Sequence, residues 1–179
     1  MSLGLNPYKL LFIDECGTHL NMQSDYARSP KGQRAYAKRP YHDGERINLI
    51  SGLSLEGIQA PWLVKNGPID GLTFLTYVEH ILLPTLREGQ IIIVDNYSIH
   101  KSEAVRVMIE QAGCELKFLP TYSPDLNPIA LAFSKIKAFL RHIKPQSFEE
   151  LSCAFVSAFK AISLADVCGW FRHAGYQAL

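Results

Sequence analysis

Two short runs of bulky apolar residues, each followed directly by an aspartate, are the clearest pattern in the chain. Residues 10–13 read Leu-Leu-Phe-Ile before Asp14, and residues 91–94 read Ile-Ile-Ile-Val before Asp95. Such a run, bounded by polar residues, is typical of a strand buried on both faces. If the two strands are neighbours, both carboxylates lie at one edge of a sheet, where ligands usually bind in α/β folds. One strand-end aspartate alone is more often a capping or solvated residue, so the two aspartates indicate a site only as a pair.

The periodicity of the other apolar positions predicts the rest of the fold. Strands are expected at residues 10–14, 47–53, 58–64, 91–95 and 116–119. Helices are expected at residues 70–84, 102–113 and 127–143, followed by one last long helix that starts at Ser147. Asp70 and Asn127 are suitable N-cap residues, and Glu150 would complete a capping box with Ser147. Three leading strands favour an antiparallel meander, and the later alternation favours parallel strands with crossover helices. We therefore predict an α/β fold, with a mixed five-stranded sheet flanked by helices.

Composition is consistent with one globular domain over residues 1–179, with 47% hydrophobic and 20% charged residues. The four cysteines and six histidines form no close pair of zinc-site type, which argues against a zinc enzyme. Apolar stretches are shorter than the roughly 18 residues of a membrane span, and no signal segment is recognisable at the start. We expect a cytoplasmic protein without a membrane partner.

The net charge of +1 conceals two basic blocks that contain no acid. Residues 26–42 carry Arg28, Lys31, Arg34, Lys38 and Arg39. Residues 126–148 carry Lys135, Lys137, Arg141 and Lys144. Such blocks suit a polyanion such as DNA, with salt-sensitive affinity. The alternative, two solvated surfaces balanced by acids elsewhere, is open at this point.

Four ordered motifs narrow the prediction to a family. The stretches FIDECG, ARSPKGQR, VDNYSIHKS and FLPTYSPDLNPI resemble the catalytic domain of DDE transposases, and the similarity runs from about Leu10 to about Ile143. The closest resemblance is to bacterial insertion-sequence relatives of the mariner group, which implies a ribonuclease-H-like fold and residence near the bacterial nucleoid. Members cut and join DNA with three carboxylates that hold two divalent metals, Mg²⁺ or Mn²⁺. Asp14 matches the first acid and Asp95 the second.

The third acid of the family is missing. The family has Glu directly after the Asn-Pro-Ile of the last motif, where this chain has Ala130 and then Leu131. On a helix, position 130 shares a face with Ser134, Lys137 and Arg141. The nearby Asp125 suits a turn, and Glu15 should point away from Asp14 by strand alternation. We therefore expect impaired activity.

The resemblance also implies a set of contacts with DNA. The basic residues named above, together with His100 and Lys101 after the second acid, are candidates for phosphate contacts, and Tyr97 and Tyr122 for base stacking. The helix-turn-helix region of the family is expected to be absent, so a separate helix-turn-helix protein, a full-length transposase or a second copy would be the partner at transposon ends.

Two interpretations from other classes are also open. One is a catalytically inactive DNA-binding or assembly module derived from a transposase. The other is an unrelated nucleotide-binding protein, which is disfavoured because no glycine-rich phosphate loop follows the first strand.

Overall fold

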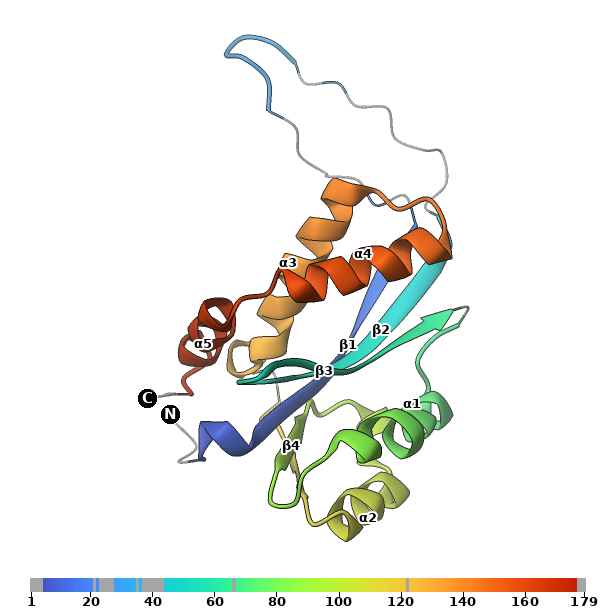
Figure 1. Cartoon of the computed structure of the whole chain (residues 1–179), viewed down its shortest axis with the longest axis vertical. Coiled ribbons are helices and arrows are strands. Elements are labelled where there is room, and N and C mark those ends of the chain that lie inside the picture. Colours follow the sequence, from blue (N-terminus) through green and yellow to red (C-terminus); the bar gives the residue numbers. More distant parts are fainter. Residues whose placement is uncertain are drawn as a thin grey trace.

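A five-stranded mixed sheet runs through the molecule, with helices on both of its faces (Figure 1). The computed structural model describes residues 5–20, 22, 28–34, 36, 44–65, 67–121 and 123–176. The strands are β1 (Leu10–His19), β2 (Arg46–Ser54), β3 (Gly57–Lys65), β4 (Ile91–Val94) and β5 (Glu115–Phe118). The helices are α1 (Gly71–Tyr77), α2 (Glu103–Gln111), α3 (Pro128–Ile143), α4 (Phe148–Lys160) and α5 (Leu164–His173). The α1 helix continues through a π turn (Val78–Leu82) and a 3-10 turn (Leu83–Thr85).

The strand order is β3-β2-β1-β4-β5. β1, β2 and β3 pair antiparallel, whereas β4 pairs parallel with both β1 and β5. This is the mixed sheet that the apolar pattern predicts. Its parallel half is short, because β4 and β5 each contain only four residues.

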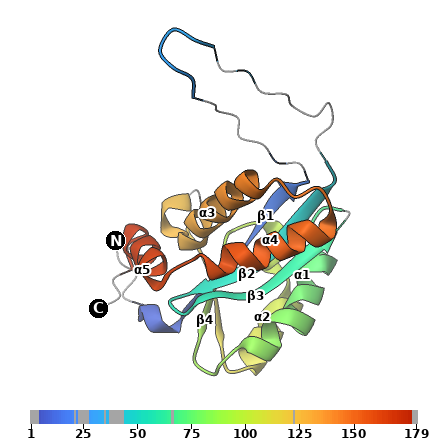
Figure 2. The same ribbon diagram turned by 45° about the horizontal axis from the view of Figure 1, so that its top comes forward.

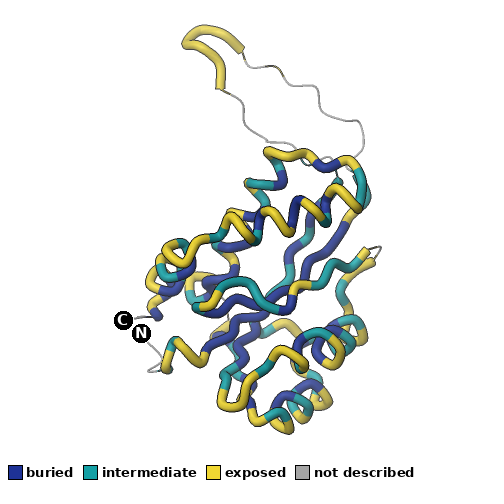
Figure 3. The backbone as a smooth tube through the Cα atoms, in the orientation of Figure 1, coloured by how far each residue is buried: buried dark blue, intermediate teal, exposed yellow. Residues whose placement is uncertain are grey.

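Side chains of β1 alternate between two hydrophobic cores. Leu10 and Phe12 belong to the core on the side of α3, α4 and α5, while Leu11 and Ile13 belong to the core on the side of α1 and α2. Figure 2 shows these two groups of helices on opposite sides of the sheet. The buried residues in Figure 3 are concentrated in the central strands and on the inner faces of the helices. A strand covered on both faces explains why the sequence of β1 opens with consecutive apolar residues.

The structure corrects two predicted boundaries. β1 does not end near Asp14 but continues to His19, because it pairs with β2 from Phe12 to His19. The last long helix is two helices, separated at residues 161–163. The second of them has its own capping box, formed by Ser163 and Asp166.

Among the described residues, no single helix is long and apolar enough to cross a membrane. The pair α4 and α5 meets that test only together, with a bend of 79° between them. Their apolar residues, including Leu151, Phe155, Val167 and Phe171, belong to the core between the sheet and α3, α4 and α5.

Candidate active site

The parallel pairing of β1 with β4 brings the two predicted aspartates to the same cleft. Phe12 pairs with Ile93, and continuing this register by two residues sets Asp14 level with Asp95. Both residues line a cleft of about 540 Å³. Its other lining residues come from the segments after β4 and β5 and from the start of α3: Asn96, Tyr97, Leu119, Pro120, Thr121, Ser123, Pro124, Asn127 and Ala130.

Asp14 is held by two donors and is largely enclosed. Its Oδ1 accepts the backbone N–H of Glu15 at 2.7 Å, and its Oδ2 accepts the side-chain amide of Asn127 at 2.8 Å. Burial raises the pKa of Asp14 to about 6, and the nearby charges of Glu15 and Asp95 act in the same direction. Burial is therefore the largest cause of the raised pKa, and the second acid of the site adds to it.

Asp95 differs from Asp14 because a histidine lies against it. His100 Nδ1 is 2.6 Å from Asp95 Oδ1, as an ion-pair contact rather than a well-aligned hydrogen bond. The backbone N–H of Tyr97 donates to the same oxygen at 2.9 Å. The contact with His100 lowers the pKa of Asp95 below its ordinary value. The pKa values of the two aspartates therefore shift in opposite directions, which is common where carboxylates share a functional site.

His100 also reaches the acid next to Asp14. Its Nε2 is 2.8 Å from Glu15 Oε1. Burial disfavours charge on this ring, but the contacts with Asp95 and Glu15 outweigh it and raise the pKa of His100 to about 9. Because the ring is only 1% exposed, it cannot serve as the phosphate contact expected from the sequence.

The start of α3 faces the cleft, and this is where the third acid would be expected. Asn127 precedes α3 as its N-cap residue, but its amide donates to Asp14 instead of capping the helix. Ala130 is exposed and lines the cleft. In the described part of the chain, no three His, Cys, Asp or Glu side chains are grouped so as to hold a metal ion. Of the three expected acids, the described residues that line the cleft supply two, Asp14 and Asp95.

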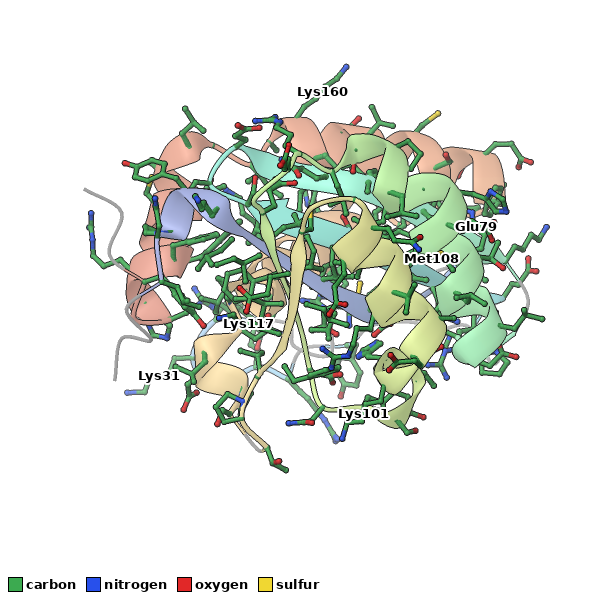
Figure 4. All side chains as sticks on the ribbon, turned by 90° about the horizontal axis from the view of Figure 1, so that it is seen from below. Lys31, Glu79, Lys101, Met108, Lys117 and Lys160 are labelled. Atoms are coloured by element: carbon green, nitrogen blue, oxygen red, sulfur yellow. The ribbon has the colours of Figure 1, made fainter. Side chains whose placement is uncertain are left out.

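The predicted basic residues differ in how available they are. Arg28, Lys31 and Arg34 are exposed in the described segment 28–34, which projects from the body of the protein (Figure 1). Lys101 is exposed and lies at the margin of the molecule in Figure 4.

Three more predicted residues lie on α3. Lys137 and Arg141 are half-buried, and the ammonium of Lys135 is 2.6 Å from Asp166 Oδ2. The predicted residues Lys38, Arg39 and Tyr122 lie outside the described residues. Tyr97 is exposed and lines the cleft, as a stacking residue would.

Sequence reasoning missed the roles of Asn127 and Glu15. Asn127 precedes a proline at a helix start, which predicted a capping role for its side chain. Its amide instead donates to Asp14, which is 113 positions away in the sequence. The expectation that Glu15 points away from Asp14 agrees with its place on the other face of β1, where it meets His100. Strand alternation predicted the face of β1 on which Glu15 lies, but no spacing in the sequence predicted its contact with His100.

The model of the DDE superfamily endonuclease family matches residues 9–152. No curated protein matches the chain.

Several solved structures have the same fold. A pre-cleavage Mos1 transpososome has a TM-score of 0.76 and 20% identity, covering 95% of this chain and 53% of that chain. The Mos1 mariner paired end complex with Mn has a TM-score of 0.74 and 20% identity, covering 93% and 54%. The catalytic domain of Mos1 mariner transposase has a TM-score of 0.67 and 17% identity, covering 94% and 76%. The chain thus has the ribonuclease-H-like fold and spans about half the length of the chains in the first two complexes.

Proposed function

The chain belongs to the DDE superfamily endonucleases, and on this basis we propose that it is a transposase catalytic domain that cuts and joins DNA ends with a divalent metal. The observation that carries the proposal is that Asp14 and Asp95, on neighbouring parallel segments, line one cleft. The motif resemblance supports a place among bacterial insertion-sequence transposases, acting on DNA in the cytoplasm. The Mos1 paired-end complexes with a left transposon end, with Mn and with Mg are consistent with these proposals for this chain.

The donor set of the cleft fits one hard divalent cation. Two carboxylates with oxygen donors suit Mg²⁺ or Mn²⁺, and the one imidazole beside them in the described residues, that of His100, has both ring nitrogens against carboxylates. Asp14 and Asp95 would hold the ion. A bound ion of this kind supplies activation of the attacking oxygen and stabilisation of charge at the phosphate.

The protein itself supplies orientation and the binding of DNA. Asn127 fixes one oxygen of Asp14, and the backbone of Glu15 fixes the other. These contacts hold the carboxylate in one orientation, which a reaction in line at phosphorus requires. Lys101 and the segment 28–34 are exposed and offer positive charge for DNA phosphates.

Ala130 makes this copy impaired. Its methyl group lies where the cleft would need a third carboxylate, and a methyl group cannot bind a metal. One ion held by two acids leaves the second ion of a two-metal site without adequate ligands. The same observation favours a second candidate function, a DNA-binding or assembly module without catalysis. Metal-dependent cleavage separates the two candidates.

The experiment restores the missing acid. Ala130→Glu, Ala130→Gln and the native chain are compared for Mn²⁺ affinity by calorimetry and for plasmid nicking with Mn²⁺ or EDTA. Ala130→Glu should bind Mn²⁺ more tightly and nick more DNA than Ala130→Gln, which is similar in size but neutral. Ser134→Glu is the matched control, because it adds the same charge one turn further along α3, outside the cleft lining.

Each outcome decides between the candidates. Nicking by the native chain that depends on Mn²⁺ and is lost in Asp95→Asn would support a catalytic domain active with two acids. Gain of nicking only in Ala130→Glu would support an impaired catalytic domain. No nicking in any variant, together with retained DNA binding, would support the assembly module instead.

DNA binding is tested by the dependence of affinity on salt. Each phosphate contact that is removed lowers the salt slope by about 1. Lys101→Ala should produce this change, and replacement of Arg28, Lys31 and Arg34 by Ala should lower the slope further. Lys160→Ala is the control, because Lys160 lies at the opposite margin of the molecule from Lys101 (Figure 4). If Lys101→Ala left the salt slope unchanged, Lys101 would not be one of the residues that contact DNA phosphates.

A further inference from the structure

His100 is a buried polar residue in contact with two carboxylates that come from different strands. It belongs to the 3-10 turn Ser98–Lys101, which follows β4. The imidazole is 1% exposed and its centre is 4.4 Å from that of the Phe74 ring in α1. One ring nitrogen faces Asp95 and the other faces Glu15. The contact of Nε2 with Glu15 has hydrogen-bond geometry, whereas the contact of Nδ1 with Asp95 is an ion pair.

Asp95 needs such a contact because the sheet no longer holds it. β4 ends at Val94, so Asp95 is the first residue beyond the ladder, and its side chain is 46% exposed. The contacts with the Tyr97 N–H and with His100 both fall on Oδ1. Oδ2 is therefore the oxygen that remains for a cation in the cleft.

Glu15 holds one end of the His100 ring in place. It lies within β1, where pairing with Ile50 of β2 fixes its backbone. Its side chain is 17% exposed and lies on the face of the sheet that carries α1 and α2, opposite Asp14. The ring of His100 is thus held at one end by a residue of the rigid central strand and meets Asp95 at its other end.

We propose that His100 is a positioning residue, which with Glu15 holds the carboxylate of Asp95 in the orientation that binds the metal. This inference rests on the proposed function of Asp95 as a metal ligand. Partners of this type, one contact removed from the ion, typically change metal affinity about 10–100-fold when they are lost. Glu15, although next to Asp14 in sequence, acts through His100 and does not itself bind the ion.

Two substitutions at position 100 separate positioning from packing. Asparagine can place its amide near the position of Nδ1 and so keeps a donor toward Asp95. Glutamine reaches the position of Nε2 and keeps a donor toward Glu15. Both variants lack the imidazole ring that packs against Phe74. If His100 served packing alone, the two variants would therefore show equal effects.

The first readout needs no metal. NMR spectra of the metal-free protein report the Asp95 carboxyl ¹³C signal and the Tyr97 amide signal, whose acceptor is the same carboxylate. His100→Asn should leave both signals near their native positions, whereas His100→Gln should shift both. His80→Gln is the control and should shift neither, because His80 is an exposed histidine on the π turn after α1.

The second readout is Mn²⁺ affinity in the Ala130→Glu background. His100→Gln should weaken binding about 10–100-fold, and His100→Asn should recover most of that loss. If the substitutions at position 100 prevent folding, the pair Glu15→Gln and Glu15→Ala tests the same link. Gln keeps an acceptor for Nε2 and should preserve the Asp95 signal, whereas Ala should shift it.

The outcomes distinguish this inference from the proposed function. Equal shifts of the Asp95 and Tyr97 signals in the Asn and Gln variants, or in the two Glu15 variants, would overturn the positioning role. Absence of Mn²⁺ binding in Ala130→Glu itself would overturn the metal site, while the metal-free spectra would still decide whether His100 orients Asp95.

Discussion

Replacing Asp14 by asparagine should stabilise the fold at neutral and alkaline pH. Asparagine has nearly the same shape as aspartate but carries no charge, and the carboxylate of Asp14 is largely enclosed by the cleft wall, β1 and Asn127. A charged group that loses contact with water and has no cation beside it opposes folding. The native residue is therefore a cost in stability that its proposed role in binding a metal would explain.

The magnitude follows from the pKa of Asp14. A rise from an ordinary value of 3.8 to about 6 corresponds to about 3 kcal/mol. Because the folded pKa is the higher one, this contribution to stability is fully present below about pH 4 and is lost as the pH rises through about 6. The asparagine side chain has one acceptor oxygen for the two donors that Asp14 satisfies, which costs about 1 kcal/mol. The net gain at pH 8 should be about 2 kcal/mol.

Guanidinium unfolding of both proteins, followed by circular dichroism between pH 4 and pH 8, measures this difference. Subtracting the two pH profiles cancels the other titrating groups. The variant should be more stable at pH 8, and the two curves should converge or cross as the pH falls below about 5. A constant difference across this pH range, or a variant that is less stable at pH 8, would refute the reasoning. Mn²⁺ should stabilise the native chain more than the variant.

Three further changes test other parts of the structure. Ser163→Ala removes the side-chain cap of α5 and should lower the free energy of unfolding by about 1 kcal/mol, measured by denaturation. Phe171→Ala empties a fully buried site beside Phe12 and should cost about 3–5 kcal/mol in the same assay. Asn127→Ala removes a hydrogen bond that lowers the pKa of Asp14, so an NMR titration should place that pKa above the native value.

The sequence was sufficient for most of the sheet and for two of the acids. Consecutive apolar residues in β1 and β4 predicted strands covered on both faces, and an aspartate follows the apolar run of each. The resemblance of the last motif marked position 130 as the place of the missing third acid, and Ala130 does line the cleft. The strands could be predicted because local periodicity determines them.

The contacts that organise the site depended on tertiary structure. Residues 15–19 include polar residues and a glycine, and they form a strand only because β2 pairs with them. Asn127 carries a strong capping signal, yet its amide is used by Asp14. His100 and Glu15 are 85 positions apart, and nothing in the local pattern of either predicts that they meet. Such contacts follow from strand order and register, which a single sequence does not specify.

The extension of β1 beyond Asp14 has a consequence for the accuracy with which the acids are placed. A slip of β1 by one residue would exchange Asp14 and Glu15 between the two faces of the sheet, since side chains alternate along a strand. The parallel pairing with β4 involves only Leu10, Leu11 and Phe12 of β1, and so short a pairing opposes such a slip only weakly. The antiparallel pairing with β2 continues from Phe12 to His19, well past the acids. The far end of β1, which lies outside the cleft lining, therefore fixes the register of the strand. This register keeps the carboxylates of Asp14 and Glu15 on opposite faces of the sheet.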